Sequence, residues 1–274
     1  MSDRRTVAIT GASSGIGAQL AALHARNGWD VVMINRSAPR SQPVIDDITA
    51  ESPDVSVDVV VADLADHGSI TAAASELVER GHIDLFYNNA GVLLAGIEKS
   101  KHGIEMHAQV NTIAPYMFAR LLQPVLDGST VLTVSTGAIS NTGDLRVADL
   151  ADPPSFKKLT GPYAQSKLAA SALMAAFAEQ YPATTFRTAE PGAVKTKMTT
   201  GDAMPKLLIP IRNLFFSTPE KGARRLYDAA TDDSLDVVNG AFVVKGEAKA
   251  LPSSAIDPAV HTQLLDWCRS VTGI

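Results

Sequence analysis

The chain of 274 residues is poor in cysteine, and Cys268 is the only one. A single thiol cannot form an internal disulfide, so the fold does not depend on such bonds. The N-terminal residues, Met-Ser-Asp-Arg-Arg, contain neither the apolar core of a signal peptide nor a membrane-spanning helix. We therefore expect a cytoplasmic protein that does not contact a membrane.

A surplus of basic residues is also absent. The 24 Lys and Arg residues against 29 Asp and Glu residues give a formal net charge of −5, and no basic stripe runs along the sequence. This balance argues against nucleic acids and anionic membranes as partners. The 19 glycines and 15 prolines are scattered, so no linker divides the chain. We expect one domain over residues 1–274 that acts on a small molecule.

The spacing of the histidines does not predict a metal site. His102 and His107 are the nearest to a helical ligand pair, but residues five apart do not share one helix face. No metal is expected in this protein.

What the sequence does contain is a regular alternation of strand-like and helical segments. The strand-like runs cover residues 6–10, 31–35, 55–62, 83–87, 130–135, 184–190 and 241–244. The helical segments cover residues 15–27, 42–51, 67–80, 101–126, 163–180, 219–230 and 258–271. Strict alternation implies parallel strands joined by right-handed crossovers. The predicted fold is α/β, a doubly wound seven-stranded parallel sheet with helices on both faces.

Two segments interrupt this alternation. Residues 141–160 are rich in Asp, Pro and Lys and are expected to form a polar excursion before the helix at 163–180. Residues 198–218 are largely apolar but contain Pro205 and Pro210, which argue against one long helix. The second segment either caps the core with two short helices or forms a mobile flap over an apolar substrate.

A glycine-patterned loop follows the first strand. Its sequence, Thr-Gly-Ala-Ser-Ser-Gly-Ile-Gly, spans residues 10–17 and leads directly into a helix. Glycines permit a tight turn and a close approach of the backbone, and a helix N-terminus attracts a pyrophosphate. The pattern predicts a dinucleotide site. The expected contacts are Gly11, Ser13, Ser14, Gly15, Ile16 and Gly17.

The end of the second strand bears on the choice between NAD and NADP. An acidic residue here would bind the ribose 2′-hydroxyl of NAD, whereas an Arg accommodates the 2′-phosphate of NADP. Residues 31–44 contain no Asp or Glu, and Asn35, Arg36 and Ser37 occupy the position in question. An exposed Arg is also a common solvated residue, but we favour NADP(H) over NAD(H).

A phenol and an ammonium lie one helical turn apart at Tyr163 and Lys167. Residues four apart share a helix face, with about 6 Å between their Cβ atoms. The ammonium favours the phenolate, so the pKa of Tyr163 is expected to fall towards the working pH. Such a group exchanges a proton with the oxygen of a carbonyl or an alcohol. A Tyr and a Lys at this spacing are more often exposed neighbours without a catalytic role. The catalytic interpretation therefore depends on the glycine-patterned loop upstream.

With these motifs in order, the chain resembles the short-chain dehydrogenase/reductase family, from residue 6 almost to the C-terminus. The resemblance also covers Asp63-Leu64, Asn88-Asn89-Ala90-Gly91, Asn111 and Pro191-Gly192-Ala193-Val194-Lys195-Thr196. It implies a Rossmann-type fold in which these motifs surround the cofactor. The further cofactor contacts implied are Asp63, Leu64, Asn89, Ala90, Gly91, Tyr163, Lys167, Pro191, Gly192, Val194 and Thr196. Residues 101–111, 163–170 and 218–223 are most similar to the retinol dehydrogenase and protochlorophyllide reductase-like group.

The sequence departs from the family at the catalytic hydroxyl. The family carries a Ser-Ser-like pair after the fifth strand, and here the pair is Ser135-Thr136. Adjacent strand residues face opposite sides, so one of the two is expected to face the substrate. Thr136 aligns with the family's catalytic serine and is preferred, while Ser135 stays open if the strand end is irregular. Ala114 stands where a Gly is common.

The resemblance implies a carbonyl reductase or alcohol dehydrogenase acting on a hydrophobic small molecule. Thr136 or Ser135 would bind the carbonyl oxygen, Tyr163 would donate the proton, Lys167 would bind the nicotinamide ribose, and Asn111 would support a relay water. Two alternatives remain, a reductase of activated C=C bonds and a non-catalytic NADP(H) sensor.

Two further expectations concern a charged side chain and the assembly. Glu190 either touches substrate or pairs with Arg187, and the pairing is the preferred interpretation. Relatives are often dimers or tetramers built through the helices corresponding to residues 101–126 and 163–180. Some members of the subgroup are monomers, so all three states are open.

Overall fold

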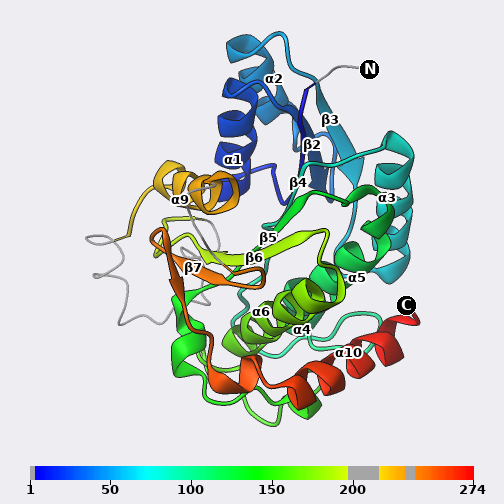
Figure 1. The fold of residues 1–274 in the computed structure, drawn as a ribbon, viewed down its shortest axis with the longest axis vertical. Helices are drawn as coiled ribbons and strands as arrows, with labels where there is room; N and C mark the ends of the chain where they lie inside the picture. The colour runs from blue at the N-terminus through cyan, green and yellow to red at the C-terminus, as the bar shows by residue number, and fades with distance from the viewer. Residues whose placement is uncertain (1–3, 197–215, 233–237) are drawn as a thin grey trace.

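One eight-stranded sheet forms the centre of the molecule (Figure 1). The computed structural model describes residues 4–196, 216–232 and 238–274. The strands are β1 Thr6–Thr10, β2 Asp30–Asn35, β3 Val57–Val61, β4 Leu85–Asn88, β5 Thr130–Val134, β6 Thr185–Glu190, β7 Phe242–Val244 and β8 Glu247–Lys249. Their order is β3-β2-β1-β4-β5-β6-β7-β8, and β1 to β7 are all parallel. The predicted doubly wound fold is confirmed.

The eighth strand was not predicted. β8 runs antiparallel to β7 and is exposed along its length. Lys245 and Gly246 join the two strands with φ values of 53° and 81°. Two residues with positive φ make the tight hairpin turn whose twist matches that of the strands. All three residues of β8, Glu-Ala-Lys, are exposed, so this strand shows no alternation of buried and exposed residues. The hydrophobic pattern of the sequence therefore could not reveal the strand.

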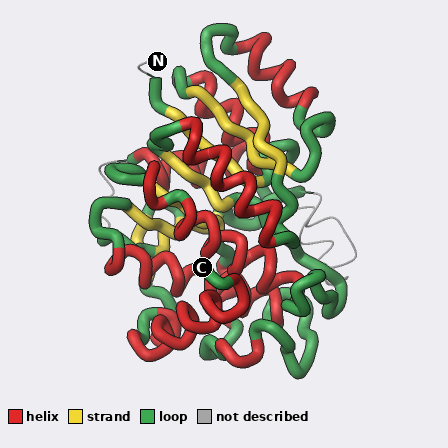
Figure 2. Tube along the Cα trace, turned by 90° about the vertical axis from the view of Figure 1, so that its right-hand side faces the viewer, coloured by secondary structure: helices red, strands yellow, loops and turns green. Residues whose placement is uncertain are grey.

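Helices cover both faces of the sheet (Figures 1 and 2). Their bounds are α1 Gly15–Arg26, α2 Gln42–Glu51, α3 His67–Arg80, α4 Met106–Ala108, α5 Ala114–Leu121, α6 Pro162–Gln180, α9 Pro219–Thr231 and α10 Pro258–Thr272. Side chains of α1, α2 and α9 form one buried cluster against the sheet. Side chains of α3, α5, α6 and α10 form the other. No helix in the described parts of the chain is long and apolar enough to cross a bilayer.

The helix predicted over residues 101–126 begins only at Met106 and is irregular, although it runs without a gap to Leu121. It consists of α4, a π-helical turn over Gln109–Ile113, α5 and a short 3-10 turn over Gln123–Val125. Pro115 gives a physical reason for the π-helical turn, because it has no N–H for the carbonyl of Asn111 four residues earlier. The chain widens at this point, so the carbonyl of Asn111 lies outside the regular α-helical ladder.

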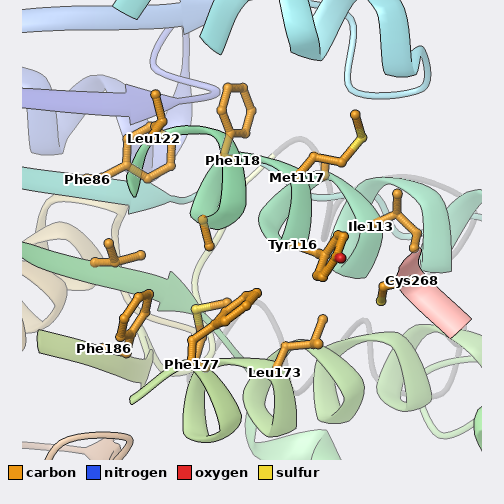
Figure 3. Packing of buried hydrophobic residues seen from close by; sticks show 14 of the residues in the cluster. Phe86, Ile113, Tyr116, Met117, Phe118, Leu122, Leu173, Phe177, Phe186 and Cys268 are labelled. Carbon is orange, nitrogen blue, oxygen red and sulfur yellow. The ribbon is translucent and has the colours of Figure 1, made fainter. Parts of the chain in front are cut away.

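α6 is buried nearly all round, between the sheet and α10. Figure 3 shows Phe177 of α6 between Tyr116 of α5 and Phe186 of β6, with ring centroids 5.8 and 5.7 Å away. Cys268 of α10 approaches the same cluster. Burial raises the pKa of the Cys268 thiol, so this side chain packs as a small apolar group.

The two irregular segments differ in how far they are described. Residues 141–160 form a polar excursion, as predicted, and the Gln165 amide on α6 donates to the carbonyls of Thr142 and Asp144. The segment 198–218 lies almost entirely outside the described residues. Val194, before the segment, and Ser217, near its end, form an isolated parallel bridge.

Candidate active site

The glycine-rich loop lies between β1 and α1, at the carboxyl edge of the parallel sheet, where ligands of this architecture bind. Gly11 and Gly15 have φ values of 72° and 60°, a region that side chains with a Cβ rarely adopt. At Gly17 a Cβ would lie 2.6 Å from the amide nitrogen Nδ2 of Asn89. The loop therefore needs glycine at each of these positions.

Thr10 and Asn89 hold this loop against the end of β4. The Thr10 hydroxyl accepts hydrogen bonds from the backbone N–H groups of Asn89 and Ala90, both at 3.0 Å. The Asn89 amide donates to the carbonyl of Thr10 at 2.8 Å. The sequence predicted Asn89 as a site residue but missed Thr10. Its position as the last residue of the first strand was the available signal.

The N-terminus of α1 fits a phosphate group. Ser14 occupies the N-cap position in extended conformation, and its side chain makes no capping hydrogen bond. The first N–H groups of a helix need an acceptor, and an anion can supply it. Thr196 lies on the other side of the loop, with its methyl carbon 3.7 Å from the position of a Cβ on Gly15. Ile16 and Val194 pack together against Gly222 of α9.

The residues after β2 divide into one buried and one exposed side chain. Asn35 is buried and accepts from the Ser13 N–H at 3.2 Å, while its amide donates to the Ser41 hydroxyl at 2.9 Å. The Ser41 hydroxyl in turn donates to the carbonyl of Ser37 at 3.3 Å, so Asn35 links the glycine-rich loop to the turn after β2. Arg36 is exposed and forms no ion pair within the described parts of the chain.

Asp63 and Leu64 follow β3 at the same edge of the sheet. Asp63 is exposed, and its carboxylate accepts from the Ala65 N–H at 3.0 Å. The carbonyl of Leu64 accepts from the Gln109 amide at 3.1 Å. These contacts hold the pair at the carboxyl edge of the sheet, two strands from β1.

The structure separates the two candidate hydroxyls. The Ser135 hydroxyl is buried and lies 3.1 Å from that of Ser171 on α6. The Thr136 hydroxyl instead lies beside the phenol of Tyr163 and lowers its pKa. Thr136 is thus the hydroxyl that reaches the tyrosine, while Ser135 joins the strand to the helix.

Lys167 is buried, and its ammonium donates to the carbonyl of Val134 at 2.7 Å. Burial lowers the pKa of Lys167 to about 8. Burial also raises the pKa of Tyr163, and this effect outweighs the opposing interaction with Thr136. The expected fall of the Tyr163 pKa is therefore wrong for this structure, because removal of the phenol from water dominates.

Asn111 and Lys167 converge on Gly91. A Cβ at Gly91 would lie 3.0 Å from Oδ1 of Asn111 and 3.3 Å from the Lys167 ammonium. The Asn111 side chain accepts from the Val92 N–H at 2.9 Å and donates to the Val92 carbonyl and the Ser166 hydroxyl. Both amide hydrogens are in use, so the side chain fastens the loop after β4 to α6. Support of a relay water stays a prediction.

A buried pair beside Tyr163 was missed by the sequence analysis. The His107 ring lies edge-on to the Tyr163 ring with 6.1 Å between centroids. Its Nε2 accepts from the Leu94 N–H at 2.9 Å, so Nδ1 carries the proton and donates to Glu105 at 2.7 Å. The pair fixes the loop after β4 beside the phenol. Its spacing, Glu-Met-His, carried no metal or catalytic signal.

The Pro-Gly loop after β6 lies against α9. Arg225 donates to the carbonyl of Pro191 at 3.0 Å, and its guanidinium touches Gly192. The expected pair of Glu190 and Arg187 does not form. Arg187 donates to the carbonyl of Ala229 instead, because this side chain turns towards α9.

Comparisons with known proteins agree with this arrangement. Residues 5–205 match the family model for the short chain dehydrogenases. Mouse polyprenol dehydrogenase is 32% identical over 90% of this chain and 77% of its own. Mouse retinol dehydrogenase 14 is 29% identical over 98% of this chain and 86% of its own. A Burkholderia cenocepacia short chain dehydrogenase, crystallised with NADP, has the same fold. It aligns over 88% of this chain and 95% of its own with a TM-score of 0.69 and 22% identity.

Proposed function

Because the chain belongs to the short-chain dehydrogenase family, and within it to the retinol dehydrogenase-like group, we propose that it is an NADP(H)-dependent oxidoreductase that interconverts a carbonyl and an alcohol. One observation carries the proposal. The phenol of Tyr163 lies beside the Thr136 hydroxyl, on the same helix as the buried ammonium of Lys167, at the edge of the sheet that holds the glycine-rich loop.

The residues present fit the cofactor. The uncapped N-terminus of α1 would receive the pyrophosphate, and Asp63, which is exposed after β3, would contact the adenine. Arg36 is exposed, and residues 31–44 contain no Asp or Glu, which favours the 2′-phosphate of NADP over the free ribose of NAD. When bound, the nicotinamide would supply a hydride to a carbonyl carbon or accept one from an alcohol carbon.

The side chains of the site provide the proton and the polarising group. In the reducing direction, the Thr136 hydroxyl donates a hydrogen bond to the carbonyl oxygen and stabilises its developing negative charge. Tyr163 gives its phenolic proton to the same oxygen. Because burial raises the pKa of Tyr163 above its usual 10.0, the phenol is protonated at neutral pH and ready to donate.

Lys167 acts after the proton has left. Below a pH of about 8 its ammonium is charged, and it stabilises the phenolate of Tyr163 one helical turn away. The raised pKa of the phenol keeps Tyr163 protonated in the resting enzyme, which is the form that reduction of a carbonyl requires.

A hydrophobic substrate is supported by the names of two relatives, a retinol dehydrogenase and a polyprenol dehydrogenase. Both names describe oxidoreductases of apolar alcohols. We therefore propose an apolar alcohol, or the matching aldehyde or ketone, as the substrate class. A location in the cytoplasm stays part of this proposal, and fractionation of cells that express the protein tests it.

Cofactor binding tests the first half of the proposal. Dissociation constants for NADPH and NADH would be measured by fluorescence on the wild type, on Arg36→Ala and on Arg269→Ala. Arg269 is an exposed arginine on α10 and serves as the control. Hydrogen bonds to charged groups contribute about 1.5–3 kcal/mol, so Arg36→Ala should weaken NADPH binding roughly tenfold to a hundredfold. Equal affinity for NADH in the wild type would refute the NADP preference.

Turnover tests the second half. The wild type should convert apolar ketones or aldehydes to alcohols with NADPH, and Tyr163→Phe should lose roughly 10²–10⁴-fold in kcat. Tyr181→Phe, near the other end of α6, is the matched control and should retain activity. A saturated carbonyl product would instead identify a C=C reductase. Cofactor binding without turnover of any substrate would identify a sensor.

A further inference from the structure

Glu190 is the last residue of β6 and lies at the edge of the sheet that carries the site. The preceding residue, Ala189, accepts a hydrogen bond from the Ser135 N–H at 2.8 Å. Glu190 itself is paired with Val244 of β7. Its side chain therefore starts next to the strand end from which Thr136 projects.

The carboxylate of Glu190 rests on the backbone directly after Thr136. A Cβ at Gly137 would lie 2.6 Å from Oε2 of Glu190, which is closer than two such atoms approach in proteins. The glycine thus leaves room for the carboxylate beside the predicted catalytic hydroxyl. Any larger residue at position 137 would push the carboxylate away.

This carboxylate has no partner in the described parts of the chain. No hydrogen bond or ion pair reaches it, although it is partly buried. Arg225 directs its guanidinium to the carbonyl of Pro191. Arg225 and Lys245 influence Glu190 only through space, and burial raises the pKa of the carboxyl. A carboxylate that has lost part of its water without gaining a donor is disfavoured, and no contact within the described fold offsets this loss.

We propose that Glu190 is a substrate-binding residue that accepts a hydrogen bond from a hydroxyl group next to the reacting carbon, so that the enzyme prefers hydroxy-carbonyl compounds. The inference rests on the proposed function. A neutral donor is favoured over an ammonium because Arg225 and Lys245 already place two positive charges near the carboxylate. The apolar remainder of the substrate is unaffected by this requirement.

The test compares substrates that differ in one donor. NADPH-dependent reduction of 2-hydroxyacetophenone, 2-methoxyacetophenone and 2-aminoacetophenone would be measured, within a wider set of ketones and aldehydes, on the wild type, Glu190→Ala and Glu190→Gln. The methoxy compound retains the oxygen but cannot donate. Glu79→Ala, an exposed carboxylate on α3, is the control variant.

In the wild type, kcat/KM should favour the hydroxy over the methoxy compound by about tenfold to a hundredfold. Glu190→Ala should remove this preference by raising KM for the hydroxy compound alone, because the bond is present in ground state and transition state alike. Glu190→Gln should retain part of it, since its amide oxygen still accepts. A structural defect would instead slow both substrates equally.

The other outcomes separate this inference from the proposed function. Turnover with a hydroxy-to-methoxy ratio that Glu190→Ala and Glu190→Gln leave unchanged would overturn the inference and leave the function intact. A preference for the amino compound that depends on Glu190 would overturn the assignment of a hydroxyl. Absence of turnover with every carbonyl compound, despite NADPH binding, would refute the proposed function itself.

Discussion

The two adjacent hydroxyls at the end of β5 give a test at the scale of single residues. Thr136→Val removes the hydroxyl beside Tyr163 and keeps the shape of the side chain, whereas Ser135→Ala breaks only the contact with Ser171. Loss of one donor to a developing negative charge typically costs about 10²–10³ in kcat. We expect such a loss for Thr136→Val and at most a few-fold change for Ser135→Ala, measured by steady-state kinetics. The reverse order would assign the catalytic hydroxyl to Ser135.

Lys167 predicts how stability depends on pH. Its pKa is about 8 in the folded protein and 10.5 when unperturbed, so the unfolded chain binds more protons between these values. The free energy of unfolding should therefore rise with pH in this range. From pH 7 to pH 9.5 the gain from this one group is about 2 kcal/mol, at 1.36 kcal/mol per pKa unit.

Denaturant unfolding of the wild type and Lys167→Met at both pH values isolates this gain. The variant leaves the Val134 carbonyl without its donor, which lowers stability equally at both pH values. Only the difference between the two proteins should change with pH, in favour of the wild type at pH 9.5. The exposed Lys221→Met is the control and should follow the wild type. Parallel pH dependence of wild type and Lys167→Met would contradict a lowered pKa.

At the scale of elements, the junction between β1 and α1 depends on Gly17. Gly17→Ala would place a methyl group against the Asn89 amide and the carbonyl of Gly11. We expect loss of NADPH binding, because the loop must open where the cofactor phosphates would lie. Gly68→Ala in α3 is the control, since its nearest neighbour would be 3.6 Å away and alanine favours a helix. Unchanged NADPH affinity of Gly17→Ala would mean that the loop does not hold the cofactor.

Several elements could be predicted from the sequence because one local rule decided each of them. The helices Gln42–Glu51 and His67–Arg80 have the predicted bounds. Asp66 caps the second of these by accepting from the Gly68 N–H at 3.0 Å. The parallel strands were visible as runs of buried apolar residues, and the motifs at their ends identified the loop and the Tyr163 helix.

Other features depend on neighbours that are distant in sequence. The helical turn at Gln109–Ile113 widens next to Pro115. In the local sequence, Pro115 is a single residue within a pattern that still predicts a helix. Whether Arg187 pairs with Glu190 depends on the position of the Ala229 carbonyl on α9, which accepts the Arg187 hydrogen bond instead. The raised pKa of Tyr163 depends on burial, whereas the spacing to Lys167 indicated only the opposing charge.

At the scale of the whole molecule, the C-terminal helix covers the face on which relatives were expected to associate. α10 packs on α6, and its Leu264 and Cys268 belong to the same buried cluster as Tyr116 of α5 and Leu173 of α6. Figure 1 shows α10 alongside α6 on the outside of the sheet layer. A second subunit could reach the apolar side of these helices only by displacing α10.

This cover predicts a monomer, although the sequence left monomer, dimer and tetramer open. Light scattering on the purified protein at micromolar concentration should give a mass near 28.9 kDa. Leu264→Asp would place a charge in the buried contact and loosen α10, so this variant should form larger species. Ser270→Asp on the exposed side of α10 should stay monomeric. A stable dimer of the wild type would show that association uses a surface other than the covered face, or that α10 moves aside to permit it.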